Sequence, residues 1–214
     1  MTDFEVSNSK AKNCAGAAER FFRLYKSHTV ATNTDTLFVL LNAIHSLNDR
    51  LKKSVDINFF DVDEFVALKA LRNLFHHEQE LISEVRAIPV IEDMPIYSDL
   101  LIMCLTPSSL VLQAIEMEEK WRPENRPRIE GALKWYGSVV DINPAIFNFA
   151  VHAYEKLRKA GVSMEDDAIA TFEASYQYEE DNGFSHFVSG DIYCRAGDVT
   201  KVLRSIYLDA IQDR

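Results

Sequence analysis

Residues 61–88, DVDEFVALKALRNLFHHEQELISEVRAI, are the stretch that decides the predicted fold. At about 100° per residue, the apolar side chains gather on one broad face, which predicts a long helix buried along one side. The apolar face consists of Phe65, Ala67, Leu68, Leu71, Leu74, Phe75, Leu81, Ile82 and Val85. The opposite face consists of Lys69, Arg72, Asn73, His76, Gln79 and Glu80.

Two further polar residues of this stretch lie close to the apolar face. His77 falls at the edge of that face and Glu78 near its centre. Burying an unpaired carboxylate costs several kcal/mol, so we expect Glu78 to face a second helix, a water-filled cleft or a subunit interface where a cation can pair with it. The helix therefore presents imidazole, guanidinium, amide and carboxylate groups within roughly 10 Å of its length, and it is the main functional lead.

The composition predicts a globular protein with a substantial core. The chain has 214 residues, of which 47% are hydrophobic, enough for one packed domain or one domain with a helical extension. No apolar stretch approaches the roughly 20 residues of a membrane span, and the first residues, MTDFEVSNSKAKN, contain no signal core. We therefore expect a cytoplasmic protein without membrane association.

The three cysteines, Cys14, Cys104 and Cys194, are widely separated and odd in number. This argues against a disulfide framework and against a clustered metal site. No glycine-rich phosphate loop, nucleophile elbow or Cys-x-x-Cys pair occurs either, and we expect no cofactor.

The formal net charge of −10 is unevenly distributed. Residues 1–90 contain 11 Lys and Arg against 12 Asp and Glu, whereas residues 91–214 contain 12 against 21. This balance argues against nucleic-acid binding through a broad basic surface, which requires clustered cations. Any action on RNA must use a local site, for which the candidate contacts are Arg50, Lys52, Lys53, Lys69, Arg72 and Arg86.

The fold class predicted from the whole chain is all-α, an antiparallel helical bundle with additional C-terminal helices, because alternating strand patterns are not evident. The predicted helices cover residues 9–27, 36–55, 61–88, 97–105, 107–121, 129–136, 143–160, 163–180 and 198–214, after a frayed tail at 1–9. Asn33 and Ser163 are cap candidates, and residues 184–197 are ambiguous. The proline-rich segment at 121–128 suggests a bundle at 1–122 and a C-terminal helical extension at 123–214 packed on it, or else one domain over 1–214.

Within the central stretch, Arg72 is followed by Asn73 and, after four intervening residues, by His77. This Arg-x4-His pattern resembles the HEPN superfamily, all-α proteins whose Arg-x4-6-His motif marks metal-independent endoribonucleases of toxin–antitoxin and defence systems. A second match, Arg23 to His28, ends the first predicted helix. The Arg-Asn pair, the long amphipathic helix and the polar neighbours favour the copy at 72–77.

The resemblance implies a reaction in which the ribose 2′-hydroxyl attacks the adjacent phosphate and leaves a 2′,3′-cyclic phosphate without a metal. His77 would move protons, Arg72 would stabilise the phosphate charge, and Asn73 would orient His77 or a phosphate oxygen. On one helix, however, Arg72 and His77 lie about 140° apart, whereas Arg72 and His76 lie only about 40° apart. The resemblance also implies a homodimer with a shared cleft, which would bring two motifs together; otherwise His76 is the rival catalyst.

Other interpretations stay open. The protein could be a noncatalytic all-α interaction protein whose acidic C-terminal half binds a protein partner. For a nuclease, the resemblance implies an antitoxin as a possible partner. It could also be a small-molecule-binding helical module. His76 and Glu80, four residues apart, could share a metal with His45, although exposed pairs of this kind are more often surface residues.

Overall fold

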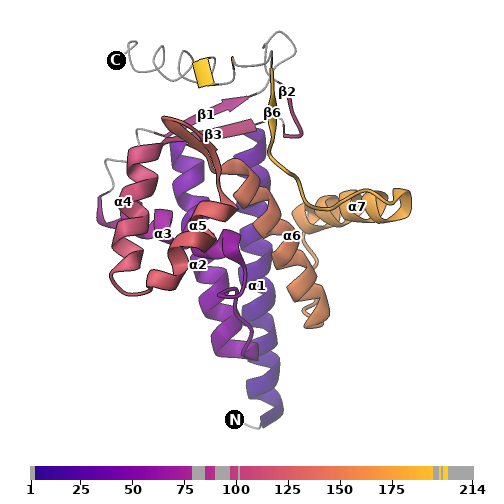
Figure 1. Cartoon of the computed structure of the whole chain (residues 1–214). Helices are drawn as coiled ribbons and strands as arrows, with labels where there is room; N and C mark the ends of the chain where they lie inside the picture. Colours follow the sequence, from indigo (N-terminus) through magenta and orange to yellow (C-terminus); the bar gives the residue numbers. More distant parts are fainter. Residues whose placement is uncertain are drawn as a thin grey trace.

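The computed structural model describes residues 3–78, 85–89, 97–100, 102–194, 198 and 200–201. Within these residues the fold is predominantly α-helical, as predicted, with a small antiparallel sheet at one end (Figure 1). The helices are α1 (Asp3–Val30), α2 (Thr34–Val55), α3 (Asp63–His77), α4 (Ser108–Glu119), α5 (Arg126–Ala132), α6 (Asn143–Lys159) and α7 (Asp167–Asn182), with a 3-10 turn, η2, at Pro123–Asn125.

The long helices α1 and α2 lie side by side in antiparallel orientation (Figure 1). Asn33 ends the short connection between them, as the sequence predicts. Its side chain accepts a hydrogen bond from the backbone N–H of Thr36 at 2.9 Å, and the Thr36 hydroxyl accepts one from the backbone N–H of Asn33 at 3.1 Å. This capping box satisfies donors at the start of α2, which would otherwise lack intrahelical partners.

The prediction of one helix over residues 61–88 is wrong at Glu78 and from Val85 onward, and residues 79–84 lie outside the described part of the chain. α3 ends at His77, and Arg86–Pro89 form strand β1, which pairs with β3 at Ile102–Pro107. Residues 97–105 were likewise expected to be helical, but Tyr97–Ser98 form β2 and the following segment belongs to β3. Both stretches are short and rich in apolar residues, a pattern that does not separate a buried strand from a buried helix.

The main sheet has the strand order β1-β3-β5-β4, and all its neighbours are antiparallel. β4 (Lys134–Tyr136) and β5 (Val139–Asp141) form a hairpin around Gly137 and Ser138, so the helix expected at 129–136 ends early, at Ala132. Gly137 has φ +72°, which glycine adopts without strain and which suits a two-residue hairpin turn. A second sheet pairs β2 with β6 (Ile192–Tyr193).

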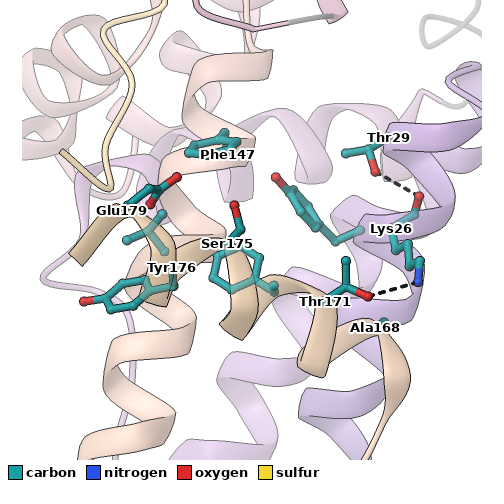
Figure 2. A pocket seen from close by; sticks show the side chains of 11 residues that line it. Lys26, Thr29, Phe147, Ala168, Thr171, Ser175, Tyr176 and Glu179 are labelled. Atoms are coloured by element: carbon teal, nitrogen blue, oxygen red, sulfur yellow. Dashed lines mark hydrogen bonds between the residues drawn. The ribbon is translucent and has the colours of Figure 1, made fainter. Parts of the chain in front are cut away.

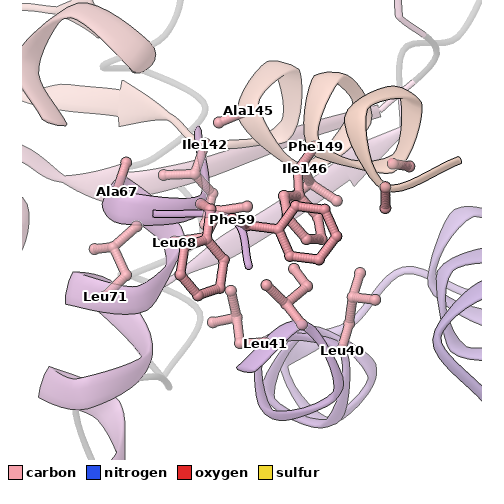
Figure 3. Close-up of a cluster of buried hydrophobic side chains, with 14 of the residues drawn as sticks. Leu40, Leu41, Phe59, Ala67, Leu68, Leu71, Ile142, Ala145, Ile146 and Phe149 are labelled. Atoms are coloured by element: carbon pink, nitrogen blue, oxygen red, sulfur yellow. The ribbon is translucent and has the colours of Figure 1, made fainter. Parts of the chain in front are cut away.

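The core lies where α2, α3 and α6 meet (Figure 3). Phe59 and Phe149 have ring centroids 5.0 Å apart, and Phe65 lies 5.9 Å from both. Leu41, Leu68 and Ile146 contribute aliphatic side chains to the same cluster. Side chains from both sides of residue 122 therefore share one core, while the division into two units remains a prediction.

The C-terminal helices begin and end close to the predicted residues. Pro144 lies in the first turn of α6, where its missing N–H costs nothing, and Gly161, with φ +67°, follows that helix. α7 is capped by Asp166, whose side chain accepts from the backbone N–H of Ala168 at 2.8 Å, rather than by Ser163. α7 then projects from the body of the protein (Figure 1). At the other end, α1 already begins at Asp3, within the expected tail.

The last predicted helix, at 198–214, lies almost wholly outside the described residues; Thr200 and Lys201 are helical. Within the described part of the chain, no helix combines the length and hydropathy that a membrane crossing requires.

Candidate active site

A groove of about 420 Å³ runs across α1, α2 and α3 and contains Arg72. Four of its lining side chains are cationic and one is a carboxylate, in a protein whose net charge is −10. The lining residues are Arg20, Asn42, Ala43, His45, Ser46, Asp49, Arg50, Lys53 and Arg72. The groove is therefore a local basic site. An acidic protein needs such a site to bind a polyanion such as RNA.

Most of the groove comes from one face of α2. Asn42, His45, Asp49 and Lys53 recur at spacings of three and four residues, which aligns them along the helix, while Leu41 and Leu47 point into the core. The sequence carries this polar face as a helical spacing of polar residues, but no spacing within residues 61–88 indicates that Asn42 and His45 lie beside Arg72.

The guanidinium of Arg72 is held by two amide side chains. Its Nε donates to Oδ1 of Asn42 at 3.0 Å, and one terminal nitrogen donates to Oδ1 of Asn73 at 3.3 Å. Asn42 in turn donates from its side chain to the carbonyl of Phe38 at 2.9 Å. Asn73 thus orients Arg72 rather than His77, and the two neutral amides fix the guanidinium without neutralising its charge.

His45 is the imidazole that lines this groove together with Arg72. Its side chain is 28% exposed, and Nδ1 lies 3.6 Å from Oδ2 of Asp49. Burial lowers the pKa of His45 below 6.5; the Asp49 carboxylate opposes this shift, and the charges of Arg72, Lys69 and His76 add to it. His45 is therefore mainly neutral at pH 7, and a neutral imidazole can accept a proton.

His76 and His77 end α3, and both are exposed. Their ring centroids lie 5.8 Å apart. His76 follows Arg72 by four residues, so it is on the same side of the helix, and its charge influences His45. Neither His76 nor His77 is among the residues that line the groove, so within one chain His45 is the imidazole that the groove brings together with Arg72; His76 lies one helical turn beyond Arg72, outside the lining.

Glu78 caps α3 on its C-terminal side and is exposed. Its carboxylate accepts hydrogen bonds at 3.2 and 3.4 Å from the side-chain amide of Gln113 on α4. Glu78 therefore faces a second helix, one of the three surroundings expected for it, although its partner is an amide and not a cation.

The three lysines expected to bind RNA have different surroundings. Lys53 lines the groove. Lys52 is directed elsewhere, with its ammonium 5.9 Å from the ring centroid of Phe60. Lys69 donates to the buried carboxylate of Glu118 at 3.2 Å, and Asn125 donates to the same carboxylate at 2.9 Å. Lys53 is thus the lysine of this set that the groove brings together with Arg72, and Lys69 has a structural ion pair.

The second Arg-x4-His match does not form a site. Arg23 is exposed and pairs with Asp166 at 2.6 Å. His28 is fully buried, with Nδ1 2.9 Å from the Thr36 hydroxyl and Nε2 3.6 Å from the sulfur of Cys104. Burial lowers the pKa of His28 to about 4 and raises that of Cys104, so the pair is a neutral packing contact.

In the part of the chain that the structure describes, no three His, Cys, Asp or Glu side chains lie close enough together to hold a metal ion. Glu80, the suggested companion of His76, lies outside the described residues. Chemically, the groove offers a fixed guanidinium, three further cations and a neutral imidazole. Such a set can bind a phosphodiester and move a proton beside it.

Comparisons of the chain with protein-family models, with curated proteins and with solved structures find no match.

Proposed function

We propose that the chain is a metal-independent endoribonuclease of the HEPN type, acting in the cytoplasm, whose active site is the groove between α1, α2 and α3. The observation that carries this proposal is that Arg72, the arginine of the Arg-x4-His pattern, is fixed beside His45 in a groove rich in cations. RNA is the fitting substrate because its 2′-hydroxyl supplies the nucleophile, so the protein needs only to transfer protons and stabilise charge.

In the proposed reaction, the phosphate lies against Arg72, and Arg20, Arg50 and Lys53 contact the neighbouring phosphates. His45 accepts the proton of the 2′-hydroxyl while that oxygen forms a bond to phosphorus. The bond from phosphorus to the 5′-oxygen breaks, and protonated His76 donates a proton to this leaving oxygen. The products are a 2′,3′-cyclic phosphate and a 5′-hydroxyl, and the two histidines exchange protonation states.

This assignment keeps Arg72 from the family pattern and gives the catalytic base to His45 within one chain. His77 would reach a phosphate at Arg72 only from a second copy of the chain, in a homodimer of the kind that the resemblance implies. Loss of cleavage in His77→Ala but not in His45→Ala would assign the base to the partner's motif.

The first experiment measures cleavage of single-stranded RNA in the presence of EDTA. The unaltered protein is expected to cleave, and Arg72→Ala is expected to lose at least a hundredfold in rate, as when other fixed charge-stabilising donors are removed. Arg158→Ala is the matched control, because Arg158 is an exposed arginine of α6 outside the groove. Equal cleavage by the Arg72 and Arg158 variants would contradict the site.

The competing proposal is a noncatalytic interaction protein, and α7 is the feature that favours it. Asp167, Glu173, Glu180 and Asp181 are exposed on this projecting helix, which forms an acidic surface for a basic protein partner. Charge reversal of Glu180 and Asp181 would weaken such a complex without changing RNA cleavage, so the two proposals have separate tests.

A further inference from the structure

A second cavity, of about 210 Å³, lies between α1, α6 and α7, away from the basic groove (Figure 2). One face of α7 forms a wall of this cavity through residues at spacings of three and four. These residues are Ala168, Thr171, Phe172, Ser175, Tyr176 and Glu179. The rest of the lining comes from α6 and α1: Phe147, Val151, Tyr25, Lys26 and Thr29.

Two polar contacts join the start of α7 to α1. Asp166 pairs with Arg23 at 2.6 Å, and the Thr171 hydroxyl accepts from the Lys26 ammonium at 3.3 Å. Within α7, the buried residues are Ala168 and Ile169, both in its first turn. The helix therefore leaves a hollow along the turns that follow Thr171.

The walls of the hollow are aromatic side chains held by their own contacts. Phe172 packs against Tyr25, with ring centroids 6.1 Å apart. Tyr176 donates from its hydroxyl to Glu155 at 3.1 Å and stacks on His186, with centroids 3.6 Å apart and an interplanar angle of 12°. A flat apolar molecule would meet surfaces that are already ordered, which favours binding.

Two hydroxyl groups of the cavity have no hydrogen-bond partner within the described residues, those of Tyr25 and Ser175. Burial, and then the charge of Glu179, raises the pKa of Tyr25, so its phenol stays protonated and can donate. Both hydroxyls can donate a hydrogen bond to an acceptor group of a ligand in the cavity.

The two ends of the cavity carry opposite charge. Figure 2 shows Lys26 at one end and Glu179 at the other, with Ser175 between them. Oε2 of Glu179 lies 2.9 Å from Nδ1 of His186, and Oε1 has no partner among the described residues. One end thus suits an anionic group of a ligand, and the other suits an N–H donor.

We propose that this cavity binds a small aromatic carboxylate of one or two fused rings that carries an N–H group on the edge opposite the carboxylate. The ring lies among Phe147, Phe172 and Tyr176. The carboxylate receives hydrogen bonds from Tyr25 and Ser175 and is paired with Lys26, while the N–H donates to Glu179.

The test is calorimetric titration of the full chain with indole-5-carboxylate, which has a carboxylate and an N–H on opposite edges of two fused rings. We expect saturable one-to-one binding, and at least tenfold weaker binding of indole, which lacks the carboxylate, and of benzoate, which lacks the N–H. Absence of saturable binding of indole-5-carboxylate at millimolar concentration would overturn the proposal.

Variants then locate the site. Ser175→Phe fills the cavity and should abolish binding, whereas Gln177→Phe, on the opposite side of α7, should bind as the unaltered chain does. Lys26→Met, a change at an exposed position, should weaken binding of indole-5-carboxylate at least tenfold and leave binding of indole unchanged. Unchanged affinity in both Ser175→Phe and Lys26→Met would place the ligand elsewhere and contradict the proposal.

Discussion

The Nε atom of Arg72 donates a hydrogen bond to Oδ1 of Asn42 at 3.0 Å, which joins the middle of α3 to α2 at the floor of the basic groove. The two residues are 30 positions apart, and each belongs to a helix whose other face is buried. Packing of α2 against α3 therefore sets the position of the guanidinium, and the amide sets its direction.

Replacing Asn42 by Ala should loosen Arg72 without removing its charge. One hydrogen bond to a charged group contributes about 1.5 kcal/mol, so we expect kcat/KM for RNA cleavage to fall roughly tenfold. The matched control is Asn182→Ala, at an exposed amide of α7. Cleavage that is equal in the two variants would show that Asn42 does not position Arg72.

The pKa of His45 makes a prediction about the pH dependence of cleavage. Because burial lowers this pKa below 6.5, the neutral form persists at moderately acidic pH, and kcat/KM should fall only below about pH 6.5, as the base becomes protonated. His45→Ala should lose about 10²–10⁴-fold in rate together with this acidic limb. An acidic limb that persists in His45→Ala would assign the base to another group.

Lys69→Met should destabilise the fold. Glu118 is only 8% exposed, and without the Lys69 ammonium its carboxylate keeps Asn125 as a donor but no counter-ion. Breaking one partner of a buried ion pair costs about 3–5 kcal/mol, which urea unfolding would measure. The double variant Lys69→Met/Glu118→Gln should recover much of the loss, because no charge is then left buried. Equal stability of the single variant and the unaltered chain would contradict this role of Lys69.

Asp141 is fully buried, and burial raises its pKa to about 6, even though its Oδ1 accepts from the backbone N–H groups of Cys104 and Asn143. A carboxyl group with a higher pKa in the folded state binds its proton more tightly there. The contribution of Asp141 to the free energy of unfolding therefore increases as the pH falls from about 6 toward 4. It decreases as the pH rises and the carboxyl group ionises.

Asp141→Asn keeps an oxygen acceptor for both N–H groups and cannot ionise. We expect this variant to be at least as stable as the unaltered chain at pH 7.5, with the difference in its favour shrinking as the pH falls to 4. Urea unfolding at a series of pH values measures this difference. A difference that does not change with pH would show that Asp141 does not titrate in this range.

The helices whose ends carry local signals were predictable from the sequence. Asn33 caps α2, Pro144 opens α6 and Gly183 ends α7 with a positive φ, and each acts through interactions with its near neighbours. The strands were not predictable in this way. β1 and β3 gain their backbone hydrogen bonds from each other, so strand pairing overrides the helical periodicity of residues 86–88.

The candidate site was predictable in part. The motif identified Arg72, and the charge distribution identified Lys53 and Arg50, because these depend on residue type and spacing within one helix. The partnership of Arg72 with Asn42 and His45 depends on which face of α2 packs against α3, and on the register between the helices. No spacing along the chain encodes that register.

The most direct test compares RNA substrates that differ in one atom. The full chain is incubated in EDTA with an oligoribonucleotide and with the same oligonucleotide carrying a single 2′-deoxy residue at a mapped cleavage site, and the products are weighed by mass spectrometry. The account predicts a 2′,3′-cyclic phosphate from the ribonucleotide and no cleavage at the deoxy position. Cleavage at the deoxy position, or the absence of any cyclic product from the unaltered RNA, would contradict it.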